Sequence, residues 1–323
     1  MTAQWTVLVA DSIALDGLAP LATDKRFELV VRPGLSGEEL ADAISTADAV
    51  LVRSATKITR ASLARADRLK AIGRAGVGID TIDVDAASKR GIPVLTAPAG
   101  NTISAAELTM ALLLAVARKV PAADRSMKAG EWDKKSFNGF ELYGKTLGLV
   151  GAGRIGGQVA KRARAFGMSV LVYDPYLLSE RARELDVQLA PLDDVIRKSD
   201  VISVHVPLTE ATAGLIGPAQ FAMMKPGALL LNVARGGVVD EAALLVALQE
   251  KKIAGAALDV YETEPLQKDS PLRSLPNVVM TPHLGASTAE AQQNVAIEIA
   301  EAVRNCLAEG DLSAAVNAAR IRR

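Results

Sequence analysis

The sequence predicts an α/β protein of two domains, each with a parallel sheet covered by helices on both faces. Three observations support this fold class. The chain has 323 residues, about twice the length of a typical single domain. Short apolar runs alternate with amphipathic stretches in two successive series, which is the pattern of β-α-β units. Aromatic residues make up only 3% of the chain, so Ala, Val, Leu and Ile must form the core, as in helices packed on buried parallel strands.

The first β-α-β series occupies the first third of the chain. Helical patterns such as GEELADAIST and TRASLARADR separate its apolar runs. The segment 96–102, TAPAGNT, ends the series with Pro and Gly and is interpreted as a crossing between domains. Five runs are predicted to be buried strands: WTVLVAD, FELVV, AVLVRS, LKAIGRAG and IPVLTAP.

A long helix is predicted after this crossing, from Ser104 to Lys119. Ser104 and Glu107 have the spacing of a capping box. The run LTMALLLAVA is apolar almost all round, so other elements must cover most of this helix, and a second subunit is one candidate. The run is about ten residues long, too short to span a bilayer.

The second series begins at KTLGLVGAGRIGGQVA and continues to NVVMTPH. A long helical pattern follows over residues 289–308, long enough to return to the first domain. We therefore expect a discontinuous substrate-binding domain, residues 1–98 with 287–323. A nucleotide-binding domain, residues 99–286, is expected to be inserted into it.

A glycine motif in the second series indicates a dinucleotide site. Gly151, Gly153 and Gly156 form a G-x-G-x-x-G pattern between a predicted strand and a predicted helix, and the next strand ends at Asp174. The glycines allow the backbone to approach a pyrophosphate at the helix N-terminus. A carboxylate at Asp174 favours the ribose of NAD over that of NADP, and no Arg stands directly beside it. The alternative is a glycine turn without a cofactor, but the surrounding pattern favours NAD in a Rossmann-like domain, with a flavodoxin-like domain before it.

Three complementary side chains follow late strands of the second series. Arg235 follows LLLNVA, Glu264 lies in YETEPL, and His283 follows NVVMTP. His283 is one of only two histidines in the chain. Each residue alone has an ordinary structural explanation, as a surface charge or a turn residue. Together, at strand ends where open α/β sheets bind ligands, they suit proton and hydride transfer from a secondary alcohol.

The motifs of the chain, from about residue 50 to residue 305, resemble those of the D-isomer-specific 2-hydroxyacid dehydrogenases. This resemblance implies an NAD-dependent oxidoreductase of two α/β domains, and a dimer formed largely by the nucleotide domains. The matching stretches are VRSATKIT, GRAGVGIDTID, GNTISAAELT, GKTLGLVGAGRIG, VYDPY, NVARGGVVDEAAL, AGAALDVYETEP and PHLGAST.

The resemblance also implies the roles of the catalytic candidates. Arg235 orients the substrate carboxylate and carbonyl, His283 exchanges the hydroxyl proton, and Glu264 holds and tunes His283. Glu262 competes with Glu264 for this role, and the resemblance selects Glu264, directly before a proline. His205 is either a cofactor-lining or a structural residue and is not the base. The residues implied to bind the cofactor are Gly151, Gly153, Arg154, Ile155, Gly156, Asp174, His205, Val206, Pro207, Thr212, Ala234 and Asp259.

Two arginines direct the choice of substrate. Arg53 and Arg74 each follow a predicted strand, and the resemblance implies that they face a phosphate, although both are also explicable as surface charges. We therefore expect a phosphorylated hydroxy acid, 3-phospho-D-glycerate, to be oxidised to 3-phosphohydroxypyruvate, the first step of serine biosynthesis. The residues expected to bind substrate are Arg53, Ser54, Arg74, Gly76, Val77, Gly78 and Asn101.

Other functions stay open at this point. One alternative is another D-2-hydroxy acid, such as glycerate, lactate or 2-hydroxyglutarate. A second is an NAD-sensing, corepressor-like binding protein. Formate oxidation is disfavoured, because the resemblance implies that formate dehydrogenases of this kind have Gln at the position of Glu264.

The bulk composition narrows the partners and the compartment. Lys plus Arg and Asp plus Glu number 37 each, which gives no indication of a nucleic-acid or membrane surface. A single cysteine and the absence of a signal-peptide pattern suggest a cytoplasmic protein. No metal site is expected. We expect a short form, or a catalytic portion, without the C-terminal regulatory domains of many related enzymes.

Overall fold

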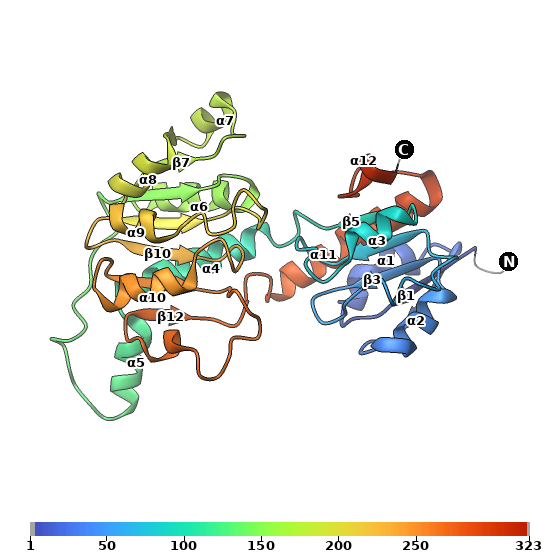
Figure 1. Cartoon of the computed structure of the whole chain (residues 1–323), viewed down its shortest axis with the longest axis horizontal. Coiled ribbons are helices and arrows are strands. Elements are labelled where there is room, and N and C mark those ends of the chain that lie inside the picture. Colours follow the sequence, from blue (N-terminus) through green and yellow to red (C-terminus); the bar gives the residue numbers. More distant parts are fainter. Residues whose placement is uncertain (1–3, 322–323) are drawn as a thin grey trace. The chain divides into compact units, whose positions relative to one another are not determined.

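The chain forms two compact units in the computed structural model, which describes residues 4–321 (Figure 1). Unit 1 comprises residues 1–101 and 287–323, and unit 2 comprises residues 102–286. The ends of the expected substrate domain, residues 1–3 and 322–323, lie outside the described residues. Each unit contains one parallel sheet, which confirms the predicted α/β class.

Unit 1 has a five-stranded sheet in the order β2-β1-β3-β4-β5, which is the flavodoxin-like order. Its strands are β1 (Trp5–Val9), β2 (Phe27–Val31), β3 (Ala49–Val52), β4 (Ala71–Arg74) and β5 (Val94–Thr96). Its helices are α1 (Ala19–Ala22), α2 (Gly37–Ser45), α3 (Val84–Lys89), α11 (Ala289–Glu309) and α12 (Ala318–Ile321), with a 3-10 turn over Leu15–Leu18.

The long helix α11 belongs to unit 1 because its apolar stripe packs on that sheet. Val295, Ile299 and Val303 share a buried cluster with strand residues of β1, β3 and β5. The helix starts where the Thr288 hydroxyl accepts from Ala291 N–H (3.1 Å), and it ends at Gly310 in a left-handed conformation (φ 70°).

Unit 2 has a seven-stranded parallel sheet in the order β12-β11-β10-β9-β6-β7-β8. This is the dinucleotide-binding order with one added strand. Its strands are β6 (Thr146–Val150), β7 (Ser169–Tyr173), β8 (Gln188–Leu189), β9 (Val201–Val204), β10 (Leu229–Asn232), β11 (Gly255–Leu258) and β12 (Val278–Met280).

Helices cover both faces of the sheet in unit 2. One buried cluster joins α4 and α6 to the sheet, and a second joins α8, α9 and α10 to it. Figure 1 shows α5 and the segment after it extending away from this sheet. The helices are α4 (Thr102–Ala117), α5 (Val120–Lys128), α6 (Arg154–Ala165), α7 (Ser179–Glu184), α8 (Leu192–Lys198), α9 (Pro218–Met223) and α10 (Glu241–Gln249), with a 3-10 turn over Pro271–Ser274.

The start of α4 corrects one prediction. The helix begins at Thr102, so Ser104 lies inside it, and its hydroxyl donates to the carbonyl of Gly285 (2.8 Å) rather than capping. Glu107 forms an ion pair with Arg162 (3.2 Å). The predicted capping box is therefore wrong, because both side chains have partners elsewhere in unit 2.

A second prediction, the helical pattern of TRASLARADR, is also wrong. Residues 60–65 form consecutive turns instead of a helix. The hydroxyl of Ser62 accepts from Thr59 N–H (2.9 Å) and donates to the Thr59 carbonyl (2.9 Å). These local side-chain bonds compete with helical hydrogen bonding, which explains the difference.

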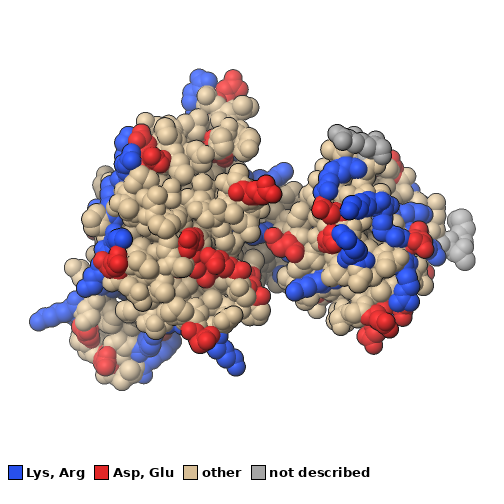
Figure 2. Space-filling view, viewed as in Figure 1, with Lys and Arg blue, Asp and Glu red and all other residues tan. Residues whose placement is uncertain are grey.

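The surface carries both signs of charge. Figure 2 shows acidic and basic side chains interspersed on the drawn face of each unit, in keeping with the equal totals of 37. Among residues 4–321, no helix is both long and apolar enough to cross a membrane.

Candidate functional site

The candidate cofactor and catalytic residues lie at one edge of the sheet in unit 2. They follow the carboxyl ends of β6, β7, β9, β10, β11 and β12, where parallel sheets of this kind bind ligands. Arg235, Glu264 and His283 thus come from three neighbouring strands of the sheet.

The turn after β6 requires glycine at two positions. Gly151 has φ 93°, and a Cβ there would lie 2.7 Å from the carbonyl oxygen of His205. A Cβ at Gly156 would overlap the carbonyl oxygen of Gly151, so only glycine allows α6 to pack this closely on the turn. Gly153 differs, since no atom lies within 4 Å of a Cβ built there. The backbone at Gly153 therefore faces open space.

The surroundings of this turn fit a dinucleotide. Arg154 and Ile155 open the 12-residue helix α6, whose unpaired N–H groups and dipole favour an anion. One carboxylate oxygen of Asp174 accepts from Ala152 N–H (2.9 Å) and the other from Tyr176 N–H (2.9 Å). Asp174 is thereby held beside the glycine turn, as a ribose-binding carboxylate should be.

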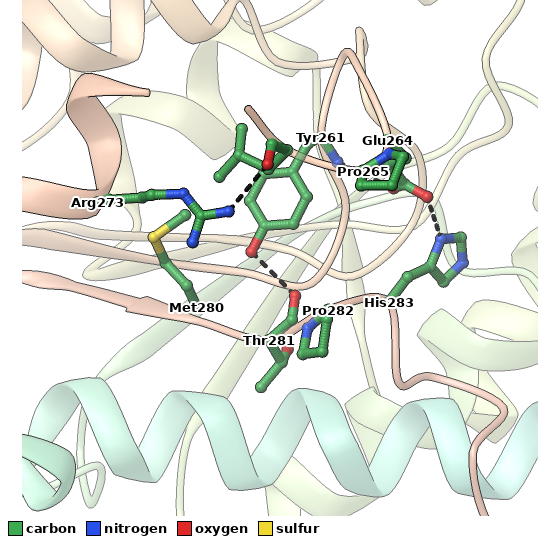
Figure 3. A pocket seen from close by; sticks show the side chains of 9 residues that line it. Tyr261, Glu264, Pro265, Arg273, Met280, Thr281, Pro282 and His283 are labelled. Carbon is green, nitrogen blue, oxygen red and sulfur yellow. Dashed lines mark hydrogen bonds and ion pairs between the residues drawn. The ribbon is translucent and has the colours of Figure 1, made fainter. Parts of the chain in front are cut away.

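His283 and Glu264 are directly paired. Nδ1 of His283 lies 2.7 Å from Oε2 of Glu264, and Oε1 of Glu264 accepts from Tyr261 N–H (3.1 Å) (Figure 3). The side chains are 48% and 36% exposed, so the pair lies open to a ligand. Since Nδ1 is occupied by the carboxylate, Nε2 is the nitrogen that can exchange a proton with a ligand.

Glu264 is held in its ionised form. Burial alone would raise the pKa of this carboxyl group. The hydrogen bond and charge of His283, the N–H of Tyr261 and the charge of Arg235 outweigh burial and lower the pKa. An ionised carboxylate at this distance orients the imidazole of His283.

Asp259 anchors the segment that carries His283. It is fully buried, and its carboxylate accepts from the Thr281 hydroxyl (2.6 Å) and from the N–H groups of Leu284 (2.7 Å) and Gly285 (2.9 Å). The Asp259 carbonyl accepts from His283 N–H (2.9 Å), and His283 has φ 55°. A left-handed conformation in a non-glycine residue is uncommon and often occurs at functional sites. Asp259 was expected to line the cofactor, and its anchoring of the His283 segment was not predicted.

Asn232 holds the turn that carries Arg235, and this role was not predicted from the sequence either. Its amide donates to the Arg235 carbonyl (2.9 Å) and accepts from Ala234 N–H (3.1 Å). The Arg235 guanidinium donates to the carbonyl of Ala234 (2.7 Å). The available signal was an asparagine at the end of a predicted strand, one residue before an Ala-Arg-Gly-Gly run.

The second histidine has a different environment. Burial lowers the pKa of His205 to about 4, and its Nε2 lies 2.8 Å from the Ser203 hydroxyl. A ring that stays neutral near pH 7 is a poor match for a proton-exchanging base. Val206 and Pro207 continue from His205 into the loop after β9, where the Thr212 hydroxyl donates to the Pro207 carbonyl (2.6 Å).

A cavity of about 580 Å³ borders the His283 and Glu264 pair within unit 2. Figure 3 shows Tyr261, Arg273 and Met280 on one side of the pair, with His283 Nε2 directed away from them. The lining residues are Tyr261, Glu264, Pro265, Leu266, Arg273, Met280, Thr281, Pro282 and His283. No group of three or more potential metal ligands lies close together within residues 4–321.

The predicted substrate residues belong to unit 1. Arg53 directly follows Val52, the register partner of Arg74, so the two arginines end neighbouring strands. The Arg74 guanidinium donates to the Ala75 carbonyl (2.6 Å) and folds over Gly76, where a Cβ would overlap it. Ser54 and Val77 are exposed, Gly78 is partly buried, and Asn101 is the last residue of the first segment of unit 1.

Comparison with known proteins finds a matching family and curated relatives that agree with it. Residues 110–285 match the family described as D-isomer specific 2-hydroxyacid dehydrogenase, NAD binding domain. The chain is 52% identical over 299 residues to D-3-phosphoglycerate dehydrogenase of Archaeoglobus fulgidus, covering 93% of this chain and 56% of that protein. It is 50% identical over 297 residues to the enzyme of the same name from Bacillus subtilis, covering 92% and 56%. The chain thus spans little more than half the length of these curated relatives.

Solved structures are similar to this chain over nearly its whole length. A crystal structure from Thermus thermophilus has a TM-score of 0.85 and 37% identity, covering 96% of this chain and 99% of that one. An NAD-dependent formate dehydrogenase from Staphylococcus aureus in complex with NAD has a TM-score of 0.83 and 28% identity, covering 95% and 96%. The family match spans more than half of the described sequence. The chain therefore belongs to the D-isomer-specific 2-hydroxyacid dehydrogenase family, and residues 110–285 are its NAD-binding domain.

Proposed function

We propose that this chain catalyses the NAD-dependent oxidation of 3-phospho-D-glycerate to 3-phosphohydroxypyruvate, the entry step to serine. The observation that carries the proposal is the His283 and Glu264 pair, 2.7 Å apart, at the same sheet edge as the Gly151 turn. The support for the substrate is the identity of about half the residues to proteins named D-3-phosphoglycerate dehydrogenase.

The proposed roles follow from the chemistry of each group. His283 Nε2 accepts the proton of the substrate hydroxyl, and Glu264 stabilises the resulting imidazolium through Nδ1. Arg235 binds the substrate carboxylate and polarises the developing carbonyl. The Gly151 turn, the N-terminus of α6 and Asp174 would hold NAD, which would supply the hydride acceptor.

In this proposal the substrate phosphate is bound by residues of unit 1. Arg53 and Arg74 offer two guanidinium groups at adjacent strand ends, and guanidinium groups suit phosphate oxygens. Ser54, the backbone of Gly76, Val77 and Gly78, and Asn101 complete the proposed substrate-binding set. Unit 1 is accordingly the proposed substrate domain.

We also propose a homodimer formed through unit 2, with α4 at its interface. Several large apolar side chains that follow α4 are exposed, among them Val120, Met127 and Trp132 at 53%, 53% and 75%. Exposed apolar groups of this size gathered along one segment are characteristic of an interaction surface. Light scattering of the purified chain should give twice the monomer mass of 33.8 kDa.

The test of the reaction is a steady-state assay with His283→Ala and the unchanged chain. The variant should lose about 10²- to 10⁴-fold in kcat, because a positioned general base contributes that much. Its NADH affinity, measured by fluorescence titration, should stay unchanged. A variant that retained most of its activity would remove His283 from the proton transfer.

The test of the substrate is a panel of hydroxy acids with the double variant Arg53→Ala plus Arg74→Ala. KM for 3-phosphoglycerate should rise about 100-fold, since two charge-assisted contacts are lost, whereas KM for glycerate or lactate should change little. Equal changes for phosphorylated and non-phosphorylated substrates would contradict the phosphate assignment. They would favour another D-2-hydroxy acid.

A further inference from the structure

Two glutamates outside the proposed catalytic set connect the segments that carry it. Glu241 is the first residue of α10, and Glu262 lies two residues before Glu264. The N–H of Glu241 donates to Oε1 of Glu262 (2.9 Å), and the N–H of Glu262 donates to Oε1 of Glu241 (2.5 Å). Each carboxylate therefore binds the backbone of the other residue. We call this reciprocal pair the glutamate clasp.

The clasp lies at the start of a helix, where backbone N–H groups need acceptors. The first N–H groups of a helix have no acceptor within the helix, so Glu262 satisfies one that Glu241 would otherwise expose. Asp240 caps the same helix by accepting from Ala243 N–H (2.9 Å). Burial raises the pKa of Glu241, the nearby Glu262 and Glu264 raise it further, and the hydrogen bond from Glu262 N–H opposes them.

A backbone contact joins the same segment to the turn of Arg235. Gly236 packs so closely that a Cβ would overlap the carbonyl group of Tyr261 and lie 2.7 Å from the Glu262 nitrogen. The Arg235 turn therefore rests directly on the peptide between Tyr261 and Glu262. The clasp binds the N–H of the same peptide, through the carboxylate of Glu241 at the start of α10.

We propose that the glutamate clasp is a positioning device that sets Arg235 relative to the Glu264 and His283 pair. This inference rests on the proposed function, in which Arg235 and His283 act on two groups of the same substrate. Small displacements matter in such a site, because a misplacement of about 1 Å can cost about 100-fold in rate. Glu262 and Glu241 thus act through the backbone and touch no substrate.

The experiment compares Glu262→Ala with Glu262→Gln. The alanine variant loses the acceptor for Glu241 N–H, whereas glutamine keeps an amide oxygen there without the charge. Glu250→Ala is the matched control, because it removes a carboxylate from the other end of α10, where Glu250 pairs with Lys252. The readouts are kcat, KM and NADH affinity, together with hydrogen exchange of the 261–264 amides. Activity is measured with the hydroxy acid that the unchanged chain oxidises best.

We expect Glu262→Ala to lower kcat about tenfold, because the free energy of one net hydrogen bond corresponds to about that change in rate. Exchange of the 261–264 amides should become faster. NADH affinity should stay unchanged, and Glu262→Gln and Glu250→Ala should behave like the unchanged chain. The inference is overturned if the alanine variant keeps its kcat, if it loses NADH affinity to the same extent, or if glutamine impairs kcat as much as alanine. A wrong substrate appears separately, as failure of the unchanged chain to oxidise 3-phosphoglycerate.

Discussion

Both units contain a parallel sheet whose strand order reverses at one point, but the turns at these two points differ. In unit 1 the strand order reverses between β1 and β3, and in unit 2 between β6 and β9. In unit 2 the first turn approaches the loop after β9 through Gly151 and leaves open space at Gly153. In unit 1 the corresponding turn carries Asp11, which is buried and accepts from the N–H groups of Arg53 (2.7 Å) and Thr56 (3.0 Å).

This difference shows that topology alone does not make a dinucleotide site. Sheets of this kind bind ligands at the carboxyl ends of their strands, yet the residue at the first turn differs between the two units. Glycine in unit 2 leaves space beside the backbone at Gly153, where we propose that a pyrophosphate binds. Aspartate in unit 1 uses the same place to hold the backbone beside a proposed phosphate-binding arginine.

Of the changes that test this comparison, a side chain at Gly151 in the first turn of unit 2 has the largest expected effect. Gly151→Ala places a Cβ against the His205 carbonyl in a residue with φ 93°. We expect the dissociation constant for NADH to rise about 100-fold, equivalent to about 2.7 kcal/mol of strain and displacement. Fluorescence titration measures this change.

A matched variant separates the turn from a general effect of alanine. Gly227→Ala lies in the same unit with no atom within 4 Å of the new Cβ and should bind NADH normally. Equal affinity of Gly151→Ala and the unchanged chain would contradict the account of the turn.

The sequence was informative wherever the signal was local. The Gly151 motif could be recognised because a strand, a turn and a helix follow one another within about thirty residues. Arg235, Glu264 and His283 could be placed at one sheet edge because each follows a strand of parallel type. The fold class followed from the same alternation of short apolar runs and helical patterns.

The contacts between distant segments could not be predicted. Asp259 meets the Thr281 hydroxyl because Leu258 pairs with Met280 in register, and that register depends on the folded sheet. Ser104 and Glu107 had the spacing of a capping box, but tertiary partners took both side chains. Local patterns therefore locate the candidate site, whereas the positioning of its side chains depends on contacts between strands.

A smaller effect is expected from the first turn of unit 1. Asp11→Ala removes the acceptor for two backbone N–H groups of the loop that begins at Arg53. We expect KM for 3-phosphoglycerate to rise about tenfold, because Arg53 loses its fixed backbone, at a cost of about one net hydrogen bond. NADH affinity should be unaffected, in contrast to Gly151→Ala. Asp16→Ala, at an exposed position of the same unit, is the control, and a change in NADH affinity would argue against separate roles of the two turns.

The smallest expected effect is a loss of folding stability at acidic pH, and it should be confined to unit 2. Both histidines of the chain lie in unit 2, and burial lowers the pKa of His205 from 6.5 to about 4. The unfolded chain therefore binds a proton at this site before the folded chain does. The stability that neutral His205 contributes is fully present above a pH of about 7 and is lost as the pH drops from about 6.5 towards 4. At a pH of about 6 the loss should be about 0.8 kcal/mol.

Hydrogen exchange can assign this loss to one unit. Amides of β6 and β9 should exchange faster at a pH of about 6 than at 7, after correction for the intrinsic rate, whereas amides of β1 and β3 should not. In His205→Gln this added pH dependence should disappear, because glutamine does not titrate. If the difference between the two sheets persisted in His205→Gln, the acid sensitivity would arise from another group, and the contrast between the units would have to be explained without His205.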